Sequence, residues 1–96
     1  MMVVVTYDVN TETPEGKRRL RNIANVCKDY GLRVQNSVFE CVVSPAQEVE
    51  LKKRLLEIIN EDSDSLRLYN LGGNYRSRIE HIGSKNVFDI DNIMIL

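Results

Sequence analysis

The sequence has no tryptophan, one histidine and two cysteines, and this scarcity excludes several kinds of site. Cys27 and Cys41 form no CxxC pair, and with a single histidine they support neither a zinc centre nor a redox motif. Both cysteines fall on apolar positions of predicted elements, so we expect buried thiols. The chain also lacks a phosphate-cradling glycine loop and a serine, histidine and carboxylate constellation, so nucleotide binding and nucleophilic catalysis are unsupported.

Long apolar runs are missing as well. No segment approaches the roughly 18 apolar residues that a membrane span requires. The first residues, MMVVVTYD, lack the basic region and cleavage site of a signal peptide. With 43% hydrophobic and 28% charged residues, the composition is that of an ordinary globular protein, so we expect a cytoplasmic protein without membrane association.

Neither charge sign dominates, since the formal net charge is −1. The chain as a whole does not attract nucleic acid, so such binding would depend on local patches. The length of 96 residues predicts one domain over residues 1–96, with a core of about residues 1–74 and a C-terminal segment of about residues 75–96. Because so small a domain buries little surface alone, we expect self-association.

What the sequence does contain is a clear succession of short elements. Residues 2–7 are β-branched and aromatic, which predicts a buried central strand that ends at Asp8. Thr13 and Pro14 supply a hydroxyl N-cap and a first-turn proline, and Gly31 is the expected helix stop. Apolar residues at spacings of three and four predict that the core-facing stripe of this helix comprises Leu20, Ile23, Ala24, Cys27 and Tyr30.

The rest of the chain predicts a hairpin, a second helix and a last strand. Residues 33–35 and 38–43 flank Asn36-Ser37, which predicts a hairpin with a tight turn. The capping-box residues 44–47 open a second helix, and residues 66–71 predict a last strand. The apolar face of the second helix is predicted to comprise Val49, Leu55, Leu56 and Ile59.

The resulting order of strand, helix, strand, strand, helix and strand predicts a fold class. Short connections in this order are typical of an α+β, ferredoxin-like βαββαβ fold, with an antiparallel sheet covered by two helices on one face. The remaining segment, residues 75–96, is too apolar for a free tail. We therefore predict a homodimer in which a C-terminal strand crosses to the partner's sheet.

Asp8 is the one carboxylate whose position suggests a site, because it lies at the end of a buried strand, where a loop begins. Magnesium is usually held by one or two protein carboxylates together with water and phosphate oxygens. Two copies of Asp8 across a dimer axis would meet that requirement and permit phosphodiester hydrolysis. A strand-end aspartate is also a common turn-former or cap, and from the residues alone that alternative stays open.

Basic residues are concentrated in the first helix. At 100° per residue, Lys17, Arg18, Arg21 and Lys28 fall within one arc, which is a candidate phosphate-binding face or else a solvated one. A second set could contact nucleic acid through charge and stacking, although its tyrosines also suit a core or interface. It comprises Arg67, Arg76 and Arg78 with Tyr69 and Tyr75.

His81 is the only side chain whose ordinary pKa lies near neutrality. Beside Glu80 it could carry a proton or sense pH. A histidine exposed at a surface or interface without such a role is the alternative.

Several segments together resemble one family. Residues 3–9, VVVTYDV, and residues 33–41, RVQNSVFEC, look like signatures of the CRISPR-associated protein 2 family. The similarity continues through residues 66–69, LRLY, and residues 80–83, EHIG, so it covers essentially the whole chain in order. The resemblance implies a ferredoxin-like homodimer whose C-terminal strands complete the partner's sheet.

The resemblance also implies site residues and partners. The family's metal-binding aspartate matches Asp8, with one Mg²⁺ or Mn²⁺ ion expected between the two copies. Tyr7, Ser37 and Phe39 are expected to support the site, and Arg33 and the first-helix cations to bind nucleic acid. Family members are endonucleases acting on RNA or double-stranded DNA, and also dimers that bridge the CRISPR integrase during spacer acquisition.

Four functions therefore stay open at this point. The chain could be a magnesium-dependent endonuclease, or a DNA-binding scaffold without catalysis. A toxin-like ribonuclease of the same fold is less favoured because the hairpin motif is intact, and a purely regulatory dimer would fit the fold equally well.

Overall fold

The computed structural model describes residues 1–83, and the predicted exchanged strand beyond them lies outside the described residues. The elements follow the predicted order. They are β1 (Met2–Asp8), α1 (Pro14–Lys28), β2 (Gly31–Gln35), β3 (Val38–Val42), α2 (Pro45–Leu56), β4 (Ser65–Gly72) and a short 3₁₀ helix, η1 (Tyr75–Arg78). Within this part of the chain, no helix has the length and apolar character needed to cross a membrane.

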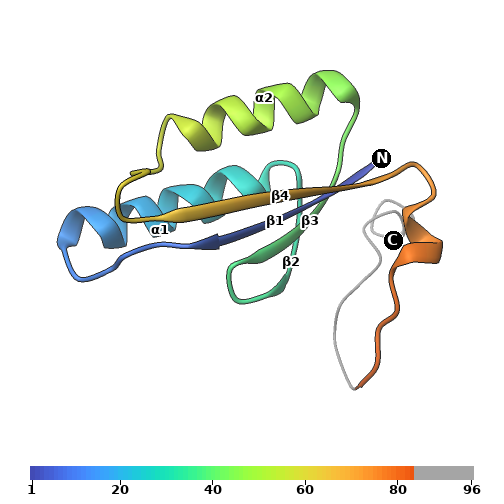
Figure 1. Ribbon diagram of the computed structural model, residues 1–96, viewed down its shortest axis with the longest axis horizontal. Helices are drawn as coiled ribbons and strands as arrows, with labels where there is room; N and C mark the ends of the chain where they lie inside the picture. Colours follow the sequence, from blue (N-terminus) through green and yellow to red (C-terminus); the bar gives the residue numbers. More distant parts are fainter. Residues whose placement is uncertain (84–96) are drawn as a thin grey trace.

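The four strands form one antiparallel sheet in the order β2-β3-β1-β4 (Figure 1). β1 lies in the centre, where it pairs with β3 on one side and with β4 on the other. This strand order and the two helices confirm the ferredoxin-like α+β fold. The fold places the end of β1, and therefore Asp8, between the hairpin turn and the start of β4.

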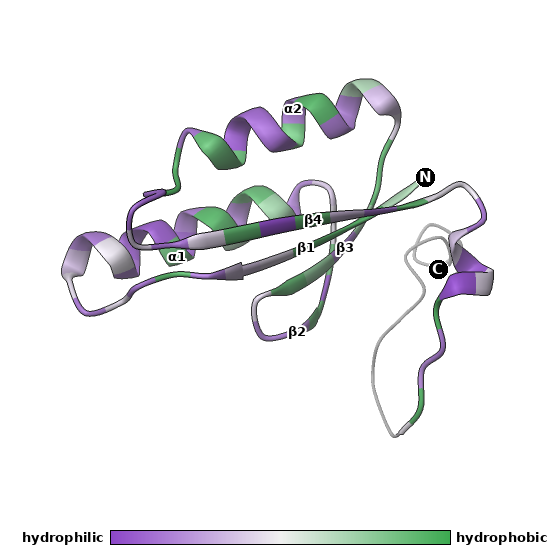
Figure 2. Ribbon diagram, in the orientation of Figure 1, coloured by the Kyte–Doolittle hydropathy of each residue, from purple (hydrophilic) through white to green (hydrophobic). Residues whose placement is uncertain are grey.

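The core lies between the sheet and the helices. Alternate residues of β1, namely Val3, Val5 and Tyr7, are buried, because side chains of a strand point to opposite faces in turn. Apolar stretches run along the strands and alternate with polar ones along both helices (Figure 2). Cys27 and Cys41 are fully buried, and this burial raises the pKa of each thiol to about 12, as expected for thiols without a chemical role.

Both predicted helix starts are confirmed, because the signals that specify them are local. The Thr13 hydroxyl accepts a hydrogen bond from the backbone NH of Gly16 at 3.0 Å. At α2 the Ser44 hydroxyl accepts from the NH of Gln47 at 3.2 Å, and the Gln47 side chain accepts from the NH of Ser44 at 2.9 Å. The two caps satisfy NH groups that a helix leaves unpaired.

The prediction that Gly31 ends the first helix was wrong. The helix ends at Lys28 with Asp29 as its cap, and Gly31 is the first residue of β2. A Cβ at this position would lie 2.1 Å from the carbonyl oxygen of Glu40. Glycine is needed here because two strands approach closely, and not because a helix terminates.

The predicted apolar face of α2 was also partly wrong. Leu55 is buried as expected, but Val49 and Leu56 are 69% and 47% exposed, and Leu51 is fully buried instead. Leu51 and Leu55 are four residues apart, so they share one side of the helix. Val49 lies about 200° of helical rotation from Leu51, which turns it toward solvent.

Candidate functional site

Asp8 occupies the C-terminal end of β1, as the sequence predicts. Its Cα lies opposite Ser65, the first residue of β4, and its side chain is exposed. Because strand residues alternate, Asp8 belongs to the same face as Thr6, whose neighbour across the strand pair is Arg67. This is the face turned away from the helices, so the carboxylate is accessible to a ligand or to another chain.

Four residues that the sequence assigned to the site lie together at the hairpin. Tyr7 and Phe39 belong to the sheet face that the helices cover, as does Arg33 opposite Phe39, whereas Asp8 belongs to the other face. The Tyr7 and Phe39 rings stack with their centroids 6.3 Å apart, and the Arg33 guanidinium carbon lies 5.2 Å from the centroid of the Phe39 ring. The backbone NH of Tyr7 donates to the carbonyl oxygen of Ser37 at 3.1 Å. The hairpin turn is thereby attached to β1 one residue before Asp8.

The cluster combines burial with one positive charge. Burial raises the pKa of Tyr7, and the nearby Arg33 guanidinium opposes that rise. Ser37 has φ 61°, a left-handed conformation that side chains other than glycine seldom adopt. Tyr7 and Phe39 are buried, whereas Arg33 is exposed.

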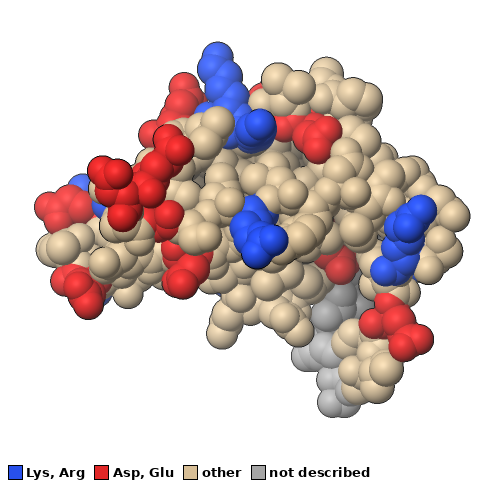
Figure 3. All heavy atoms as spheres, in the orientation of Figure 1, with Lys and Arg blue, Asp and Glu red and all other residues tan. Residues whose placement is uncertain are grey.

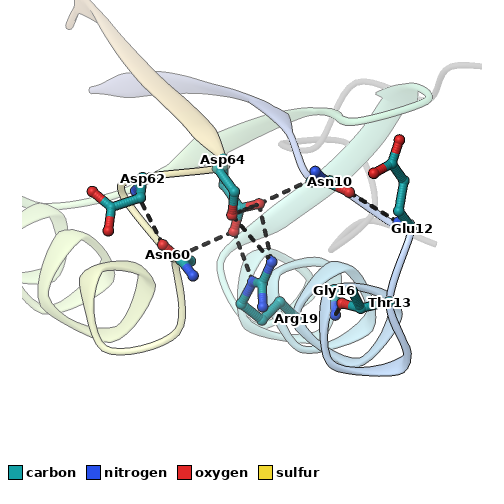
Figure 4. A network of polar contacts seen from close by, with 9 residues as sticks. Asn10, Glu12, Thr13, Gly16, Arg19, Asn60, Asp62 and Asp64 are labelled. Atoms are coloured by element: carbon teal, nitrogen blue, oxygen red, sulfur yellow. Dashed lines mark hydrogen bonds and ion pairs between the residues drawn. The ribbon is translucent and has the colours of Figure 1, made fainter.

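A polar network that the sequence did not reveal lies on the other side of Asp8 (Figure 4). The Asp64 carboxylate accepts hydrogen bonds from the Arg19 guanidinium and from the backbone NH groups of Asn10 and Asn60. The pKa of Asp64 is lowered to about 2, chiefly by the Arg19 hydrogen bond and further by the two backbone donors. Arg19 lies in the same basic stretch of α1 as Lys17, Arg18 and Arg21, but it forms an ion pair with the buried Asp64 side chain.

The other cations of α1 are free for binding. Lys17, Arg18 and Arg21 are exposed and take part in neither of the two ion pairs that residues 1–83 form. The face drawn in Figure 3 shows acidic side chains gathered at one end and basic ones scattered singly. Among the described residues, this face therefore offers no continuous positive surface.

The second basic set divides between two places. The Arg67 guanidinium lies 5.2 Å from the Tyr69 ring centroid on the face that carries Asp8, and Tyr69 is 43% exposed. Tyr75 is buried, in agreement with a core role, and Arg76 lies over its ring at 5.8 Å. Arg67 lies opposite Thr6, near the end of β1 that bears Asp8, whereas Tyr69 lies opposite Val4 in the middle of the strand.

His81 does not join the site within one chain. β4 ends at Gly72 opposite Met2, so the segment after β4 leaves from the other end of β1 (Figure 1). The exposed His81 ring nitrogen Nε2 lies 3.2 Å from the carbonyl oxygen of Gly83. A pH-linked role for this histidine stays a prediction.

The residues present fit a divalent cation only in part. Among residues 1–83, no three metal-ligating side chains are grouped together. Asp8 supplies one accessible carboxylate, which is a partial ligand set for Mg²⁺ or Mn²⁺. The donors that one chain lacks would have to come from a second copy and from substrate phosphate.

Comparison with known proteins decides the family. The family described as CRISPR associated protein Cas2 matches residues 1–79. The chain belongs to the Cas2 family. It is 56% identical over 96 residues, 100% of both chains, to a protein of Chlorobaculum tepidum named CRISPR-associated endoribonuclease Cas2.

Other members of the Cas2 family agree in sequence and in structure. A Halalkalibacterium halodurans protein named CRISPR-associated endonuclease Cas2 is 50% identical over 95 residues, 99% of both chains. The crystal structure of Streptococcus pyogenes Cas2 has a TM-score of 0.75 and 61% identity, and covers 86% of this chain and 100% of that one. The family and fold expected from residues 3–9 and 33–41 are confirmed.

Proposed function

We propose that this Cas2-family chain is a divalent-metal-dependent endonuclease that acts as a homodimer in the acquisition of CRISPR spacers in the cytoplasm. The observation that carries the proposal is the accessible Asp8 carboxylate at the end of β1, in a chain whose relatives are named endonucleases and endoribonucleases. Its substrate would be single-stranded RNA or double-stranded DNA. Phosphate contacts alone do not distinguish these two substrates.

Asp8 from each protomer would hold a Mg²⁺ or Mn²⁺ ion against the scissile phosphate. When bound, such an ion offsets phosphate charge and lowers the pKa of an attacking water. Arg33, exposed on the edge strand β2, would contact the nucleic-acid backbone at the hairpin, while the Tyr7 and Phe39 rings pack beside it. Lys17, Arg18 and Arg21 would bind the nucleic-acid backbone farther from the cleaved bond.

The homodimer is supported by apolar side chains that one chain leaves exposed. Tyr69 lies on the sheet face turned away from the helices, together with the half-buried Val4. Ile79 and Ile82, which follow η1, are 37% and 84% exposed. A second copy would cover these groups and bring a second Asp8 to the site.

A scaffold that binds DNA and bridges the CRISPR integrase is a second candidate. The exposed cations Lys17, Arg18 and Arg21 favour it, because they lie together on α1 and take part in neither ion pair of the described residues. Bridging would require these cations and the C-terminal segment but not Asp8. The two functions are compatible, so the scaffold role would survive loss of cleavage.

Cleavage of labelled single-stranded RNA and double-stranded DNA with magnesium or with chelator tests the nuclease. Wild-type protein and a folded, dimeric Asp8→Ala variant are compared. Loss of about 100-fold or more of the metal-dependent rate in the variant would support Asp8 as the metal ligand, since metal assistance is worth several kcal/mol. Equal rates in the two proteins, or no cleavage by either, would overturn the nuclease proposal and leave the scaffold.

A further inference from the structure

The loop that follows Asp8 is held from two sides. The NH of Asn10 donates to Asp64 Oδ1 at 3.0 Å, and the NH of Glu12 donates to Asn10 Oδ1 at 2.9 Å (Figure 4). On the opposite side, α1 approaches so closely that a Cβ on Gly16 would lie 1.9 Å from the carbonyl oxygen of Asn10. The path of the chain just beyond Asp8 is therefore fixed.

Asp64 is the centre of this arrangement. Its Oδ2 accepts from Arg19 Nε at 2.8 Å and from the NH of Asn60 at 3.0 Å, while Oδ1 also lies 3.3 Å from Arg19 Nη2. The Asp64 side chain is fully buried, and Arg19 is 19% exposed. A buried carboxylate with so many donors has one favoured orientation, because moving it would leave charge and NH groups unpaired.

The position of Asp64 relative to Asp8 gives this rigidity a function. Asp64 precedes Ser65, which is the partner of Asp8 across the β1 and β4 pair. Its carboxylate also binds Asn10, two residues after Asp8. One side chain thus connects the strand beside Asp8 with the loop that follows it, and it restrains the Asp8 backbone from both directions.

We propose that Asp64, oriented by Arg19, is a positioning residue that fixes the direction of the Asp8 carboxylate toward a divalent cation. The proposal rests on the proposed function of Asp8. Residues that orient metal ligands commonly change metal affinity by 10- to 100-fold when they are replaced. A small displacement of a catalytic group has an effect of similar size.

A merely structural role for Asp64 makes a different prediction. In that case its replacement would lower stability, but the molecules that stay folded would bind metal as the wild type does. A positioning role requires that metal affinity of the folded protein falls. The two possibilities are separated by measuring metal binding and loop order well below the unfolding temperature.

The experiment compares Asp64→Asn and Arg19→Lys with Arg54→Lys, which makes the same kind of change in an exposed ion pair elsewhere. Amide hydrogen exchange at Asn10 is followed by NMR, Mn²⁺ binding by electron paramagnetic resonance, and cleavage as a function of magnesium. In Asp64→Asn we expect exchange at Asn10 and the half-saturating metal concentration each to rise about tenfold. The rate at saturating metal should change less, and Arg54→Lys should match the wild type.

Arg19→Lys keeps the experiment decisive if Asp64→Asn does not fold, because Asp64 then retains its two backbone donors. An intermediate rise in the half-saturating metal concentration supports the proposal. Unchanged metal binding together with faster exchange at Asn10 would overturn it and make Asp64 structural only. If the wild type binds metal and cleaves nucleic acid no better than Asp8→Ala does, the proposed function itself fails, and the positioning role of Asp64 fails with it.

Discussion

Two ion pairs bind α1 to later parts of the chain, and they differ in nearly every respect. Arg19 and Asp64 are close to the end of β1, and the Asp64 side chain is 0% exposed. Arg54 and Asp29 lie at the other end of α1, and both are well exposed, at 38% and 59%. The first pair fixes a loop beside Asp8, whereas the second ties two helices together at the surface.

The difference lies in what else each carboxylate binds. Asp64 also accepts hydrogen bonds from two backbone NH groups, so its loss would release two loops at once. The guanidinium of Arg54 is shared between Asp29 and the hydroxyl of Tyr30, and the Tyr30 hydroxyl in turn contacts Glu50. Surface pairs of this second kind contribute little to stability. The tightly held pair is the one that lies next to the end of β1 and the loop that follows Asp8.

The largest effect on stability is expected from closing the space between α1 and the loop after Asp8. Gly16→Ala would force a methyl group against the carbonyl oxygen of Asn10 and should destabilise the fold by about 1–3 kcal/mol, measured by urea unfolding. Gly73→Ala is the matched control, because nothing lies within 4 Å of a Cβ there. Equal stability of the two variants would show that the loop yields easily.

Low pH should reduce the free energy of unfolding through the Asp64 carboxylate. The pKa of Asp64 is lowered from 3.8 to about 2 in the folded state, so its contribution to stability is fully present above about pH 4. That contribution is lost as the pH falls toward 2, because the unfolded chain then binds the proton more readily. The urea midpoint measured across this range should fall for the wild type and less steeply for Asp64→Asn. If Asp29→Asn reduces the pH dependence of the urea midpoint as much as Asp64→Asn does, that dependence does not come from Asp64 in particular.

Replacing the arginine of each ion pair compares the two pairs directly. The effect on stability is expected to be smaller than in the two experiments above. Arg19→Ala leaves the buried Asp64 carboxylate without its cation, so thermal unfolding should occur at a clearly lower temperature. Arg54→Ala removes an exposed partner and should leave the unfolding temperature nearly unchanged. If thermal scans rank the two variants the other way round, the helix contact is the more important of the two.

The smallest effect is expected from His81→Ala. Within one chain the histidine follows β4 at the end of β1 far from Asp8, so it is not placed to transfer a proton there. Cleavage measured against pH should change by about twofold or less. A loss near the 100-fold that removal of a general acid or base produces would show that the partner's histidine reaches the site.

The sequence was sufficient wherever a signal is local. Thr13 with Pro14 and Ser44 with Gln47 mark helix starts within four residues, and the β-branched and aromatic run of residues 2–7 marks the central strand. The position of Asp8 follows from the same pattern. The family resemblance then added the association of Tyr7, Arg33 and Phe39, which one chain does bring together.

Contacts between distant segments could not be predicted in this way. Asp64 and Asn10 are 54 residues apart, and Asp64 and Arg19 are 45 apart, so nothing local links them. Arg19 is one of several cations in a basic helix, and whether it forms an ion pair depends on which loop packs against it. The error at Val49 has a related cause, since several apolar stripes were compatible with the residues of α2 and only packing selects one.

Mixed dimers of wild-type and Asp8→Ala chains test most directly whether two Asp8 carboxylates form one metal site. The chains are refolded together in varying proportion, and metal-dependent cleavage is measured at constant total protein. If both carboxylates are needed, an equal mixture should retain about one quarter of the wild-type rate, because only dimers with two intact chains are active. A rate of about one half, proportional to the wild-type fraction, would mean that each Asp8 acts alone and would contradict a shared site.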